Sequence, residues 1–186
     1  SATQLRGVVQ YGLVGHSERR HVFGETDKNI RAKVQAAIRN HIQPVLCVGE
    51  TIQERSDGET DAILHDQLVG GLANITSEEI AQVVIAYEPV WAIGSGVSAK
   101  PDDVARAVKA VRSQLTHLYG KAASESVRVL YGGSVTPESA ADYLALPDID
   151  GLLVGGASLD EFAFADIVKK AHKEKSTLQP VGGKKG

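Results

Sequence analysis

Five short runs of apolar residues alternate along the chain with longer stretches in which apolar residues recur every three or four positions. The short runs occupy residues 11–14, 44–48, 83–87, 127–131 and 151–154. Near-continuous apolar strands of this kind are typical of parallel sheets that are buried on both faces. We therefore interpret the five runs as five parallel strands.

The stretches between these runs have the period of amphipathic helices. The clearest apolar stripe, with spacings of four, three, four and three, consists of Val104, Val108, Val111, Leu115 and Leu118. Two shorter stripes consist of Ile30, Val34 and Ile38, and of Leu64, Leu68 and Leu72. Pro101 followed by two aspartates predicts a helix start, because proline suits the first helical position and acids favour the positive end of the helix dipole.

A regular alternation of strand and helix predicts a βα array, which occurs either as a doubly wound open sheet or as a closed barrel. A doubly wound dinucleotide fold usually has G-x-G-x-x-G after its first strand. Here Gly94-Ser95-Gly96 follows the third run and lacks the last glycine. The polar and glycine-rich motifs follow the strands, where barrel enzymes build their sites. We therefore favour a barrel domain over residues 1–175, and we expect the Gly- and Lys-rich tail 176–186 to be disordered.

Composition narrows the classes of partner. The 186 residues include 42% apolar and 23% charged residues, with a formal net charge of -3 and interleaved signs. A nucleic-acid or anionic-membrane partner requires a basic face, and the interleaved charges predict none, so we expect neither kind of partner. No run approaches the ~20 apolar residues of a membrane span. The single cysteine, Cys47, fits a reducing compartment. It lies in an apolar run, which favours a small buried residue over a reactive thiol.

Two candidate residues for proton chemistry follow the first and third runs. His16 precedes Ser-Glu-Arg-Arg, a predicted helical turn, and a helix N-terminus favours the neutral imidazole, which can donate to a carbonyl. The alternative is a structural histidine, and we interpret the other five histidines as surface residues. Glu88 ends an apolar run beside Pro-Val-Trp, where desolvation would make it a better base. The alternative is a surface glutamate in an ordinary loop.

Glycine-rich segments follow the last three runs. The segment after Glu88 combines a stiff Pro-Val-Trp body with a glycine-rich tip, which is what a lid requires. Gly132-Gly133-Ser134 and Gly155-Gly156 follow the last two runs. Either glycine pair alone indicates only a turn. Together they are typical of the phosphate site that barrels form with the loops after their last two strands.

The motifs GHSERR, VLCVGET, IAYEPVWAIGSG, LYGGSV and DGLLVGGASL, in this order, resemble the triosephosphate isomerase family from about residue 1 to residue 173. The resemblance implies an α/β fold, a partial TIM (β/α)₈ barrel with five parallel βα units corresponding to strands four to eight. It also implies the interconversion of dihydroxyacetone phosphate and D-glyceraldehyde 3-phosphate by enediolate proton transfer, in glycolysis and gluconeogenesis. This reaction uses no cofactor and no metal, and the family implies a cytoplasmic homodimer.

The resemblance also implies roles for individual residues. Glu88 is the base, His16 is the electrophile and Glu18 supports the site. The phosphate is held by Gly94, Ser134, Gly155 and Gly156. The lid and its latch consist of Trp91, Ala92, Ile93, Ser95, Gly96 and Tyr131.

Several features depart from the family. A complete barrel has about 250 residues and eight strands, whereas five runs are present here. The resemblance places an Asn and a Lys of the active site in the first strand and the dimer loop after the third, and this chain matches neither. Ser95 replaces the usual Thr, and Val97-Ser98-Ala99 begins without the usual Lys. We expect two open sheet edges and an uncovered inner face.

Three hypotheses follow from these observations. The chain is most of an isomerase that works when the first three strands are supplied, or it is a non-catalytic structural fragment. The third hypothesis, a different phosphate-binding barrel enzyme, explains the combination of Glu88, its lid and His16 less well.

Overall fold

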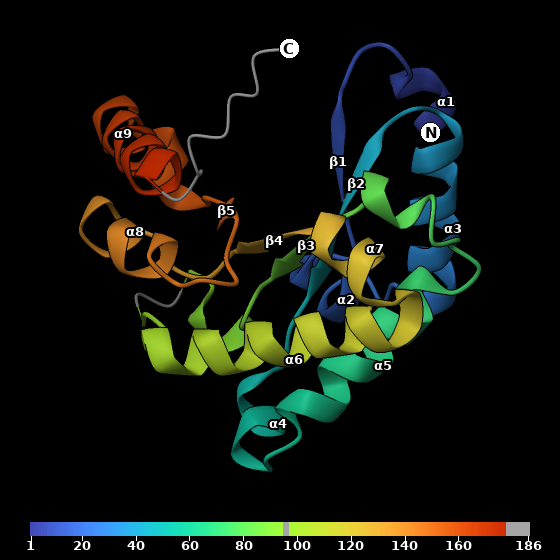
Figure 1. Cartoon of the computed structure of the whole chain (residues 1–186), viewed down its shortest axis with the longest axis horizontal. Helices are drawn as coiled ribbons and strands as arrows, with labels where there is room; N and C mark the ends of the chain where they lie inside the picture. Colours follow the sequence, from blue (N-terminus) through green and yellow to red (C-terminus); the bar gives the residue numbers. More distant parts are fainter. Residues whose placement is uncertain (95–96, 178–186) are drawn as a thin grey trace, which may run out of the picture.

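The protein forms one five-stranded parallel sheet, with strand order β1-β2-β3-β4-β5, in a computed structural model of the chain (Figure 1). The strands are β1 (Tyr11–Val14), β2 (Gln43–Val48), β3 (Val84–Tyr87), β4 (Arg128–Tyr131) and β5 (Gly151–Leu152). The structure describes residues 1–94 and 97–177, with side chains up to residue 175. The predicted lid residues Ser95 and Gly96, and residues 178–186 of the predicted tail, lie outside the described residues.

The predicted strands are confirmed, with their ends displaced by one or two residues. The largest difference is in β5, which ends at Leu152 instead of residue 154. Leu153 still donates its backbone N–H to the carbonyl of Tyr131, at 2.8 Å. The chain then leaves the sheet to enter the glycine loop at Gly155, so the expected last two strand residues belong to the segment that connects β5 to this loop.

Each strand is followed by helical structure, as a βα array requires. The α-helices are α1 (Ala2–Leu5), α2 (Ser17–His21), α3 (Asp27–Arg39), α4 (Ile52–Ser56), α5 (Thr60–Leu72), α6 (Pro101–Tyr119), α7 (Lys121–Ser126), α8 (Pro137–Leu144) and α9 (Glu161–Thr177). Three 3₁₀ turns are η1 (Ile80–Gln82), η2 (Val90–Ala92) and η3 (Gly156–Leu159). In Figure 1, helices α3, α5, α6 and α8 lie along one side of the curved sheet. The predicted domain boundary at residue 175 stays a prediction, and α9 continues to Thr177.

Local sequence signals explain where these helices begin. Pro101 takes the first position of α6, with Asp102 and Asp103 in the first turn, as predicted. Thr26 caps α3 by accepting a hydrogen bond from the backbone N–H of Asn29. Thr136 caps α8 in the same way, directly before Pro137. These caps determine the residues at which α3 and α8 begin.

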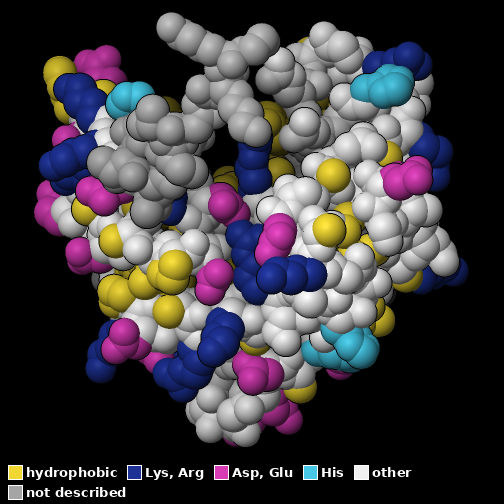
Figure 2. Space-filling view, viewed as in Figure 1, with side chains coloured by type: hydrophobic (Ala, Val, Ile, Leu, Met, Phe, Trp, Pro, Cys, Tyr) yellow, Lys and Arg dark blue, Asp and Glu magenta, His cyan; other side chains and the backbone are white. Residues whose placement is uncertain are grey.

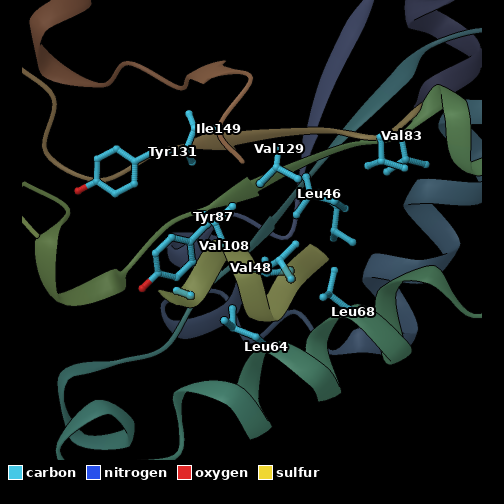
Figure 3. Packing of buried hydrophobic residues seen from close by; sticks show 14 of the residues in the cluster. Leu46, Val48, Leu64, Leu68, Val83, Tyr87, Val108, Val129, Tyr131 and Ile149 are labelled. Atoms are coloured by element: carbon cyan, nitrogen blue, oxygen red, sulfur yellow. The ribbon is translucent and has the colours of Figure 1, made fainter. Parts of the chain in front are cut away.

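The main core lies between the sheet and its outer helices. Figure 3 shows Leu64 and Leu68 of α5 pointing toward Leu46 and Val48 of β2. The predicted stripes are buried, with one exception: Leu118 of α6 is exposed. The prediction for Leu118 is wrong because Tyr119 packs against the core in the last turn, where its hydroxyl donates to the carbonyl of Leu72 at 3.1 Å.

The inner face of the sheet is covered unevenly. Val45, Cys47, Val84 and Ala86 form a second buried cluster on this face. Leu13 is in register with Val45 and therefore lies on the same face, yet it is 56% exposed. β1 and β5 each pair with one neighbour among the described strands. The inner face is therefore buried at β2 and β3 but exposed at β1, where the expected uncovered inner face is found.

On the face shown in Figure 2, the acidic and basic side chains of the described residues are interspersed. The five histidines predicted to be on the surface are exposed (His21, His41, His65, His117 and His172). Cys47 is buried, as predicted. In the described part of the chain, no helix is long and apolar enough to cross a membrane.

Candidate active site

Glu88 directly follows β3 and is a buried carboxyl, only 3% exposed. Its backbone N–H donates to the carbonyl of Val48 at 2.8 Å, which fixes it at the end of the sheet. Burial raises the pKa of Glu88, while nearby His16, the thiol of Cys47 and the backbone N–H of Ser17 oppose this rise. One carboxyl oxygen, Oε2, is buried and accepts no hydrogen bond from the described residues. Such a carboxyl is a stronger base than one in water.

His16 faces Glu88 from the end of β1. It is the N-cap of α2, where its Nδ1 accepts a hydrogen bond from the backbone N–H of Glu18 at 3.3 Å. Since Nδ1 is the acceptor, we infer that a neutral His16 carries its proton on Nε2. Nε2 lies 3.6 Å from Oε1 of Glu88, which is longer than a hydrogen bond. The donor nitrogen and the base therefore both remain available to a molecule placed against them.

Replacing Glu88 with Gln is expected to stabilise the fold at neutral pH. Because burial raises the pKa of Glu88, the folded chain keeps a proton at pH values where the unfolded chain, with the ordinary pKa of 4.5, has released it. The stability of the unsubstituted chain therefore falls as the pH rises through this window, and the variant does not titrate there. Above the window we expect Glu88→Gln to be the more stable protein, because its amide carries no charge that burial would penalise.

Urea unfolding at a series of pH values from about 4 to about 8 measures this difference. The matched control is Glu78→Gln, which changes the same chemical group at an exposed position. A Glu88→Gln variant that is less stable than the unsubstituted chain at neutral pH would contradict the prediction.

A cavity of about 430 Å³ opens beside Glu88 at the carboxyl ends of the strands. Its lining includes Glu88, Gly94, Ser134, Gly155 and Gly156. A Cβ atom at Gly155 or Gly156 would meet nothing within 4 Å, so the backbone is open to a ligand. Gly156 also begins η3. No lysine or arginine of the described residues lines this cavity, which leaves backbone N–H groups and the Ser134 hydroxyl to bind an anion.

Two glycines make room for Glu88. A Cβ at Gly132 would lie 2.8 Å from Cγ of Glu88, and a Cβ at Gly49 would lie 1.9 Å from its carbonyl oxygen. Gln67 holds Gly49 in place, since the side-chain amide of Gln67 pairs with both its N–H and its carbonyl, at 2.8 and 3.1 Å. The backbone around Glu88 therefore tolerates no added side chain.

The first part of the predicted lid is anchored to the loop after β2. Trp91 in η2 donates its indole N–H to Oε1 of Glu50 at 3.0 Å, and the hydroxyl of Tyr87 lies 3.2 Å from both carboxyl oxygens of Glu50. The guanidinium of Arg55 lies 4.5 Å from the centre of the Trp91 ring and pairs with Asp103 at 2.7 Å. These contacts hold the start of the lid from its outer side.

The rest of the predicted lid lies close to the residues predicted to bind phosphate. Ala92 is buried, whereas Ile93 is half-buried and Gly94 is exposed with a φ of 64°. Ile93 and Gly94 line the cavity. Ser95 and Gly96, predicted to complete the lid tip, lie outside the described residues. The described lid residues therefore reach the same cavity as Glu88.

Tyr131, the predicted latch, is the last residue of β4 and directly precedes Gly132 and Gly133. Its hydroxyl is buried without a hydrogen-bond partner among the described residues. A Cβ at Gly133 would lie 2.1 Å from that hydroxyl, and the Tyr131 ring centre lies 4.2 Å from that of Tyr143. The Tyr143 hydroxyl donates to the carbonyl of Ala99 at 2.8 Å, just after the lid. Tyr131 therefore presents a hydroxyl without a partner between the predicted phosphate loop and the end of the predicted lid.

Glu18 occupies a peripheral position. Its backbone N–H orients His16, but its side chain is exposed. Within the described ranges 1–94 and 97–177, no group of three or more His, Cys, Asp and Glu residues could hold a metal ion.

Sequence reasoning assigned no role to Glu50 or Arg20, which are both close to the site. Glu50 follows an apolar run and a glycine, the same signal of an acid at a strand end that marked Glu88. Arg20 lies in the Ser-Glu-Arg-Arg turn and contacts the ends of β1 and β2. No sequence signal distinguishes Arg20 from Arg19, which contacts Phe23 and Glu25 on the surface.

The fold and the site together define a barrel-type α/β protein in which a buried carboxyl, a histidine and a glycine-lined cavity lie at the carboxyl ends of the strands. The family model described as triosephosphate isomerase matches residues 1–171. Curated relatives named triosephosphate isomerase include those of Symbiobacterium thermophilum (51% identical over 162 residues), Carboxydothermus hydrogenoformans (49% over 161) and Chlamydia abortus (50% over 165). These matches cover 87–89% of this chain. The chain belongs to the triosephosphate isomerase family.

The chain spans 63–64% of the length of these relatives. Its five parallel βα units and open sheet edges agree with a partial barrel, as the sequence predicted.

Proposed function

We propose that this chain carries the proton-transfer and phosphate-binding part of a triosephosphate isomerase. The reaction interconverts dihydroxyacetone phosphate and D-glyceraldehyde 3-phosphate, in glycolysis and gluconeogenesis. The observation that carries the proposal is the arrangement of Glu88 and His16 beside a glycine-lined cavity. One carboxyl oxygen of Glu88 is buried without a hydrogen-bond partner among the described residues, and the Nε2 of His16 lies 3.6 Å from the other oxygen.

Each group has a separate task in the proposed mechanism. Glu88 removes a proton from the carbon next to the substrate carbonyl, while the Nε2–H of His16 donates a hydrogen bond to the carbonyl oxygen. Glu88 then returns the proton to the former carbonyl carbon, while the hydroxyl proton passes from one oxygen to the other beside His16, so that the carbonyl and hydroxyl groups exchange positions. No electron is gained or lost overall, so the proposed reaction requires no redox cofactor. The exposed Glu18 supports the site through its backbone N–H.

The glycine loops and the lid complete the proposed mechanism. Gly94, Ser134, Gly155 and Gly156 hold the phosphate, whose negative charge backbone N–H groups stabilise. The lid, Trp91 to Gly96, closes over the substrate and excludes water, which limits loss of phosphate from the enediolate. Tyr131 latches the closed lid with its free hydroxyl.

A coupled assay with dihydroxyacetone phosphate tests this function on what we call the supplemented chain. This is the 186-residue chain mixed with a polypeptide that supplies the part of its relatives that the chain does not match. Isomerase activity that requires both components supports the proposal. A supplemented chain that folds and binds phosphate without isomerising the triose phosphates would contradict it.

Binding of 2-phosphoglycolate, which mimics the enediolate, is expected to change the fluorescence of Trp91. This residue is the only tryptophan of the chain and lies at the start of the lid, so its emission reports on the lid directly. Closure requires a ligand with higher affinity for the closed lid. Glycolate without the phosphate is the control ligand, and we expect it to bind at least about 100-fold more weakly, a loss of roughly 3 kcal/mol of anion contacts. Equal responses to both ligands would contradict the assignment of the phosphate loops.

A Gly132→Ala variant of the supplemented chain is expected to lose about 10²-fold in kcat. The added Cβ would lie 2.8 Å from Cγ of Glu88 and would displace the base, and misplacement by about 1 Å can have an effect of this size. The matched control is Gly12→Ala, whose Cβ would meet Ile42 at an ordinary 3.5 Å. If both variants keep full activity, the position of Glu88 does not limit turnover.

We also propose that the full protein is a cytoplasmic homodimer. Its location is supported by the glycolytic role of the family and by Cys47, which is a buried free thiol. The dimer is supported by family membership, and the exposed apolar side chains of Val22 and Phe23 would suit a partner surface. Light scattering on the supplemented chain measures its mass, and a strictly monomeric active species would contradict the dimer.

A further inference from the structure

Arg20 binds the backbone at the ends of two neighbouring strands. Its side chain is 11% exposed, and its Nε donates to the carbonyl of Gly15 at 2.7 Å. Its Nη2 donates to the carbonyl of Cys47 at 3.2 Å, and its Nη1 pairs with Asp27 at 2.8 Å. The guanidinium can make these three contacts together because its donors are fixed in one plane.

The turn that leads into His16 leaves space for this guanidinium. Gly15 has a φ of 72°, which side-chain-bearing residues rarely adopt. A Cβ at Gly15 would also lie 3.0 Å from Nη2 of Arg20 and 3.2 Å from Cδ1 of Ile30. The position of His16 therefore depends on a glycine turn whose carbonyl is held by the hydrogen bond from Arg20.

Arg20 also contributes a positive charge near Glu88. The groups that act on the Glu88 carboxyl are His16, Ser17 and Arg20 from the α2 segment and the Cys47 thiol from β2. From the loop after β4 comes Gly132, which carries no charge. Within this set, Arg20 alone is permanently charged. Its charge lowers the pKa of Glu88 against the larger rise that burial causes, and a base must be ionised before it can accept a proton.

We propose that Arg20 is a positioning residue for the proton-transfer pair, which fixes the backbone before His16 and at Cys47 and holds a permanent positive charge at the ends of β1 and β2. The proposal rests on the function proposed above for His16 and Glu88. It extends that function to a residue that touches neither the cavity nor the substrate.

Three variants separate the two parts of the proposal. Arg20→Met removes the charge and the N–H donors of the guanidinium but keeps an unbranched apolar side chain. Arg20→Lys keeps the charge but cannot make the three planar contacts. Lys28→Met, on the exposed side of α3, removes one positive charge from the surface near Asp27 and is the control.

The first measurement is the titration of Glu88, followed by NMR with ¹³C-labelled glutamate and assigned with Glu88→Gln. We expect Arg20→Met to raise the titration midpoint, because it removes one of the influences that lower the pKa of Glu88. Arg20→Lys, which keeps the charge, should not move it, and neither should Lys28→Met. This titration requires no turnover, so it tests Arg20 even if the proposed isomerase activity is wrong.

The second measurement is the pH profile of the supplemented chain. In Arg20→Met we expect the acid limb of kcat/KM to move to higher pH, in parallel with the titration. We expect KM for the triose phosphate to stay unchanged, because the substitution leaves the phosphate loops as they are. Arg20→Lys should keep the acid limb but lower kcat at least about tenfold, because the backbone before His16 loses its fastening.

Several outcomes would overturn the proposal. An unchanged Glu88 titration in Arg20→Met removes the role of the charge, and an equal shift in Lys28→Met shows that any cation has this effect. Full kcat in Arg20→Lys removes the positioning role. If circular dichroism shows that Arg20→Met does not fold, Arg20→Lys and Asp27→Asn, which keeps the arginine but removes its anchor, take its place. Both must then lower kcat without moving the acid limb.

Discussion

Glu88→Gln in the supplemented chain is expected to lower kcat by about 10²–10⁴-fold, the usual contribution of a general base. The amide has nearly the shape of the carboxyl, so the cavity and the phosphate loops should be preserved and KM should change little. The loss then reports on proton transfer itself. The effect should be accompanied by the gain in stability described above, because the buried carboxyl is the group that both destabilises the fold and does the chemistry.

A coupled assay on the variant measures this loss, with Glu78→Gln as the control for an exposed acid. Glu88→Asp gives a second comparison, because it keeps a carboxyl but withdraws it by one methylene. We expect its activity to lie between those of the unsubstituted chain and the glutamine variant. A glutamine variant with more than about a tenth of the original kcat would be inconsistent with a general-base role.

The 186 residues alone are expected to be at least about 10²–10³-fold less active than the supplemented chain. This is the typical loss when one group that stabilises the developing oxyanion is removed, and no lysine or arginine of the described residues lines the cavity. The resemblance places such a Lys in the strand that this chain does not match. A second penalty comes from the sheet, because Glu88 and His16 require placement within about 0.5 Å. β1, which precedes His16, has an open edge, and its Tyr11 is 47% exposed.

The test compares the chain, the added polypeptide and their mixture in the same coupled assay. Activity in the mixture alone supports the catalytic hypothesis, and a mixture made with the Glu88→Gln chain should stay inactive. Activity of the chain alone that equals that of the mixture would refute the need for the unmatched part. A folded mixture without activity would favour the alternative of a structural fragment.

The strands and the main helices could be predicted because each has a strong local signal. Runs of apolar residues gave the five strands within one or two residues, and the stripe from Val104 to Leu115 gave the buried face of α6. The prediction failed where neighbours decide the outcome. Leu118 continues the stripe but is exposed, because Tyr119 packs against the core in the same turn. By contrast, the exposure of Leu13 agrees with the uncovered inner face that was expected of a partial barrel.

The candidate site could be predicted as a set of residues but not as a geometry. Glu88, His16 and the glycine pairs each follow a strand, and parallel strands bring their carboxyl ends to one edge of the sheet. The sequence could not give the 3.6 Å separation of Nε2 and Oε1, nor the tautomer that the N–H of Glu18 favours at His16. The contacts of Arg20 also depend on tertiary structure, because Gly15 and Cys47 lie on different strands. Glu50 could have been found, since it ends a strand run as Glu88 does.

Transfer of solvent deuterium to the triose phosphate tests the central claim most directly, that Glu88 moves a proton between two carbons of the substrate. Dihydroxyacetone phosphate is incubated with the supplemented chain in D₂O, and the substrate and product are analysed by ¹H NMR. A carboxylic acid that exchanges with solvent before it returns its proton places deuterium on carbon. We therefore predict singly deuterated product in the unsubstituted mixture and none above background with Glu88→Gln. Isomerisation without any deuterium, or equal incorporation by both proteins, would contradict the claim.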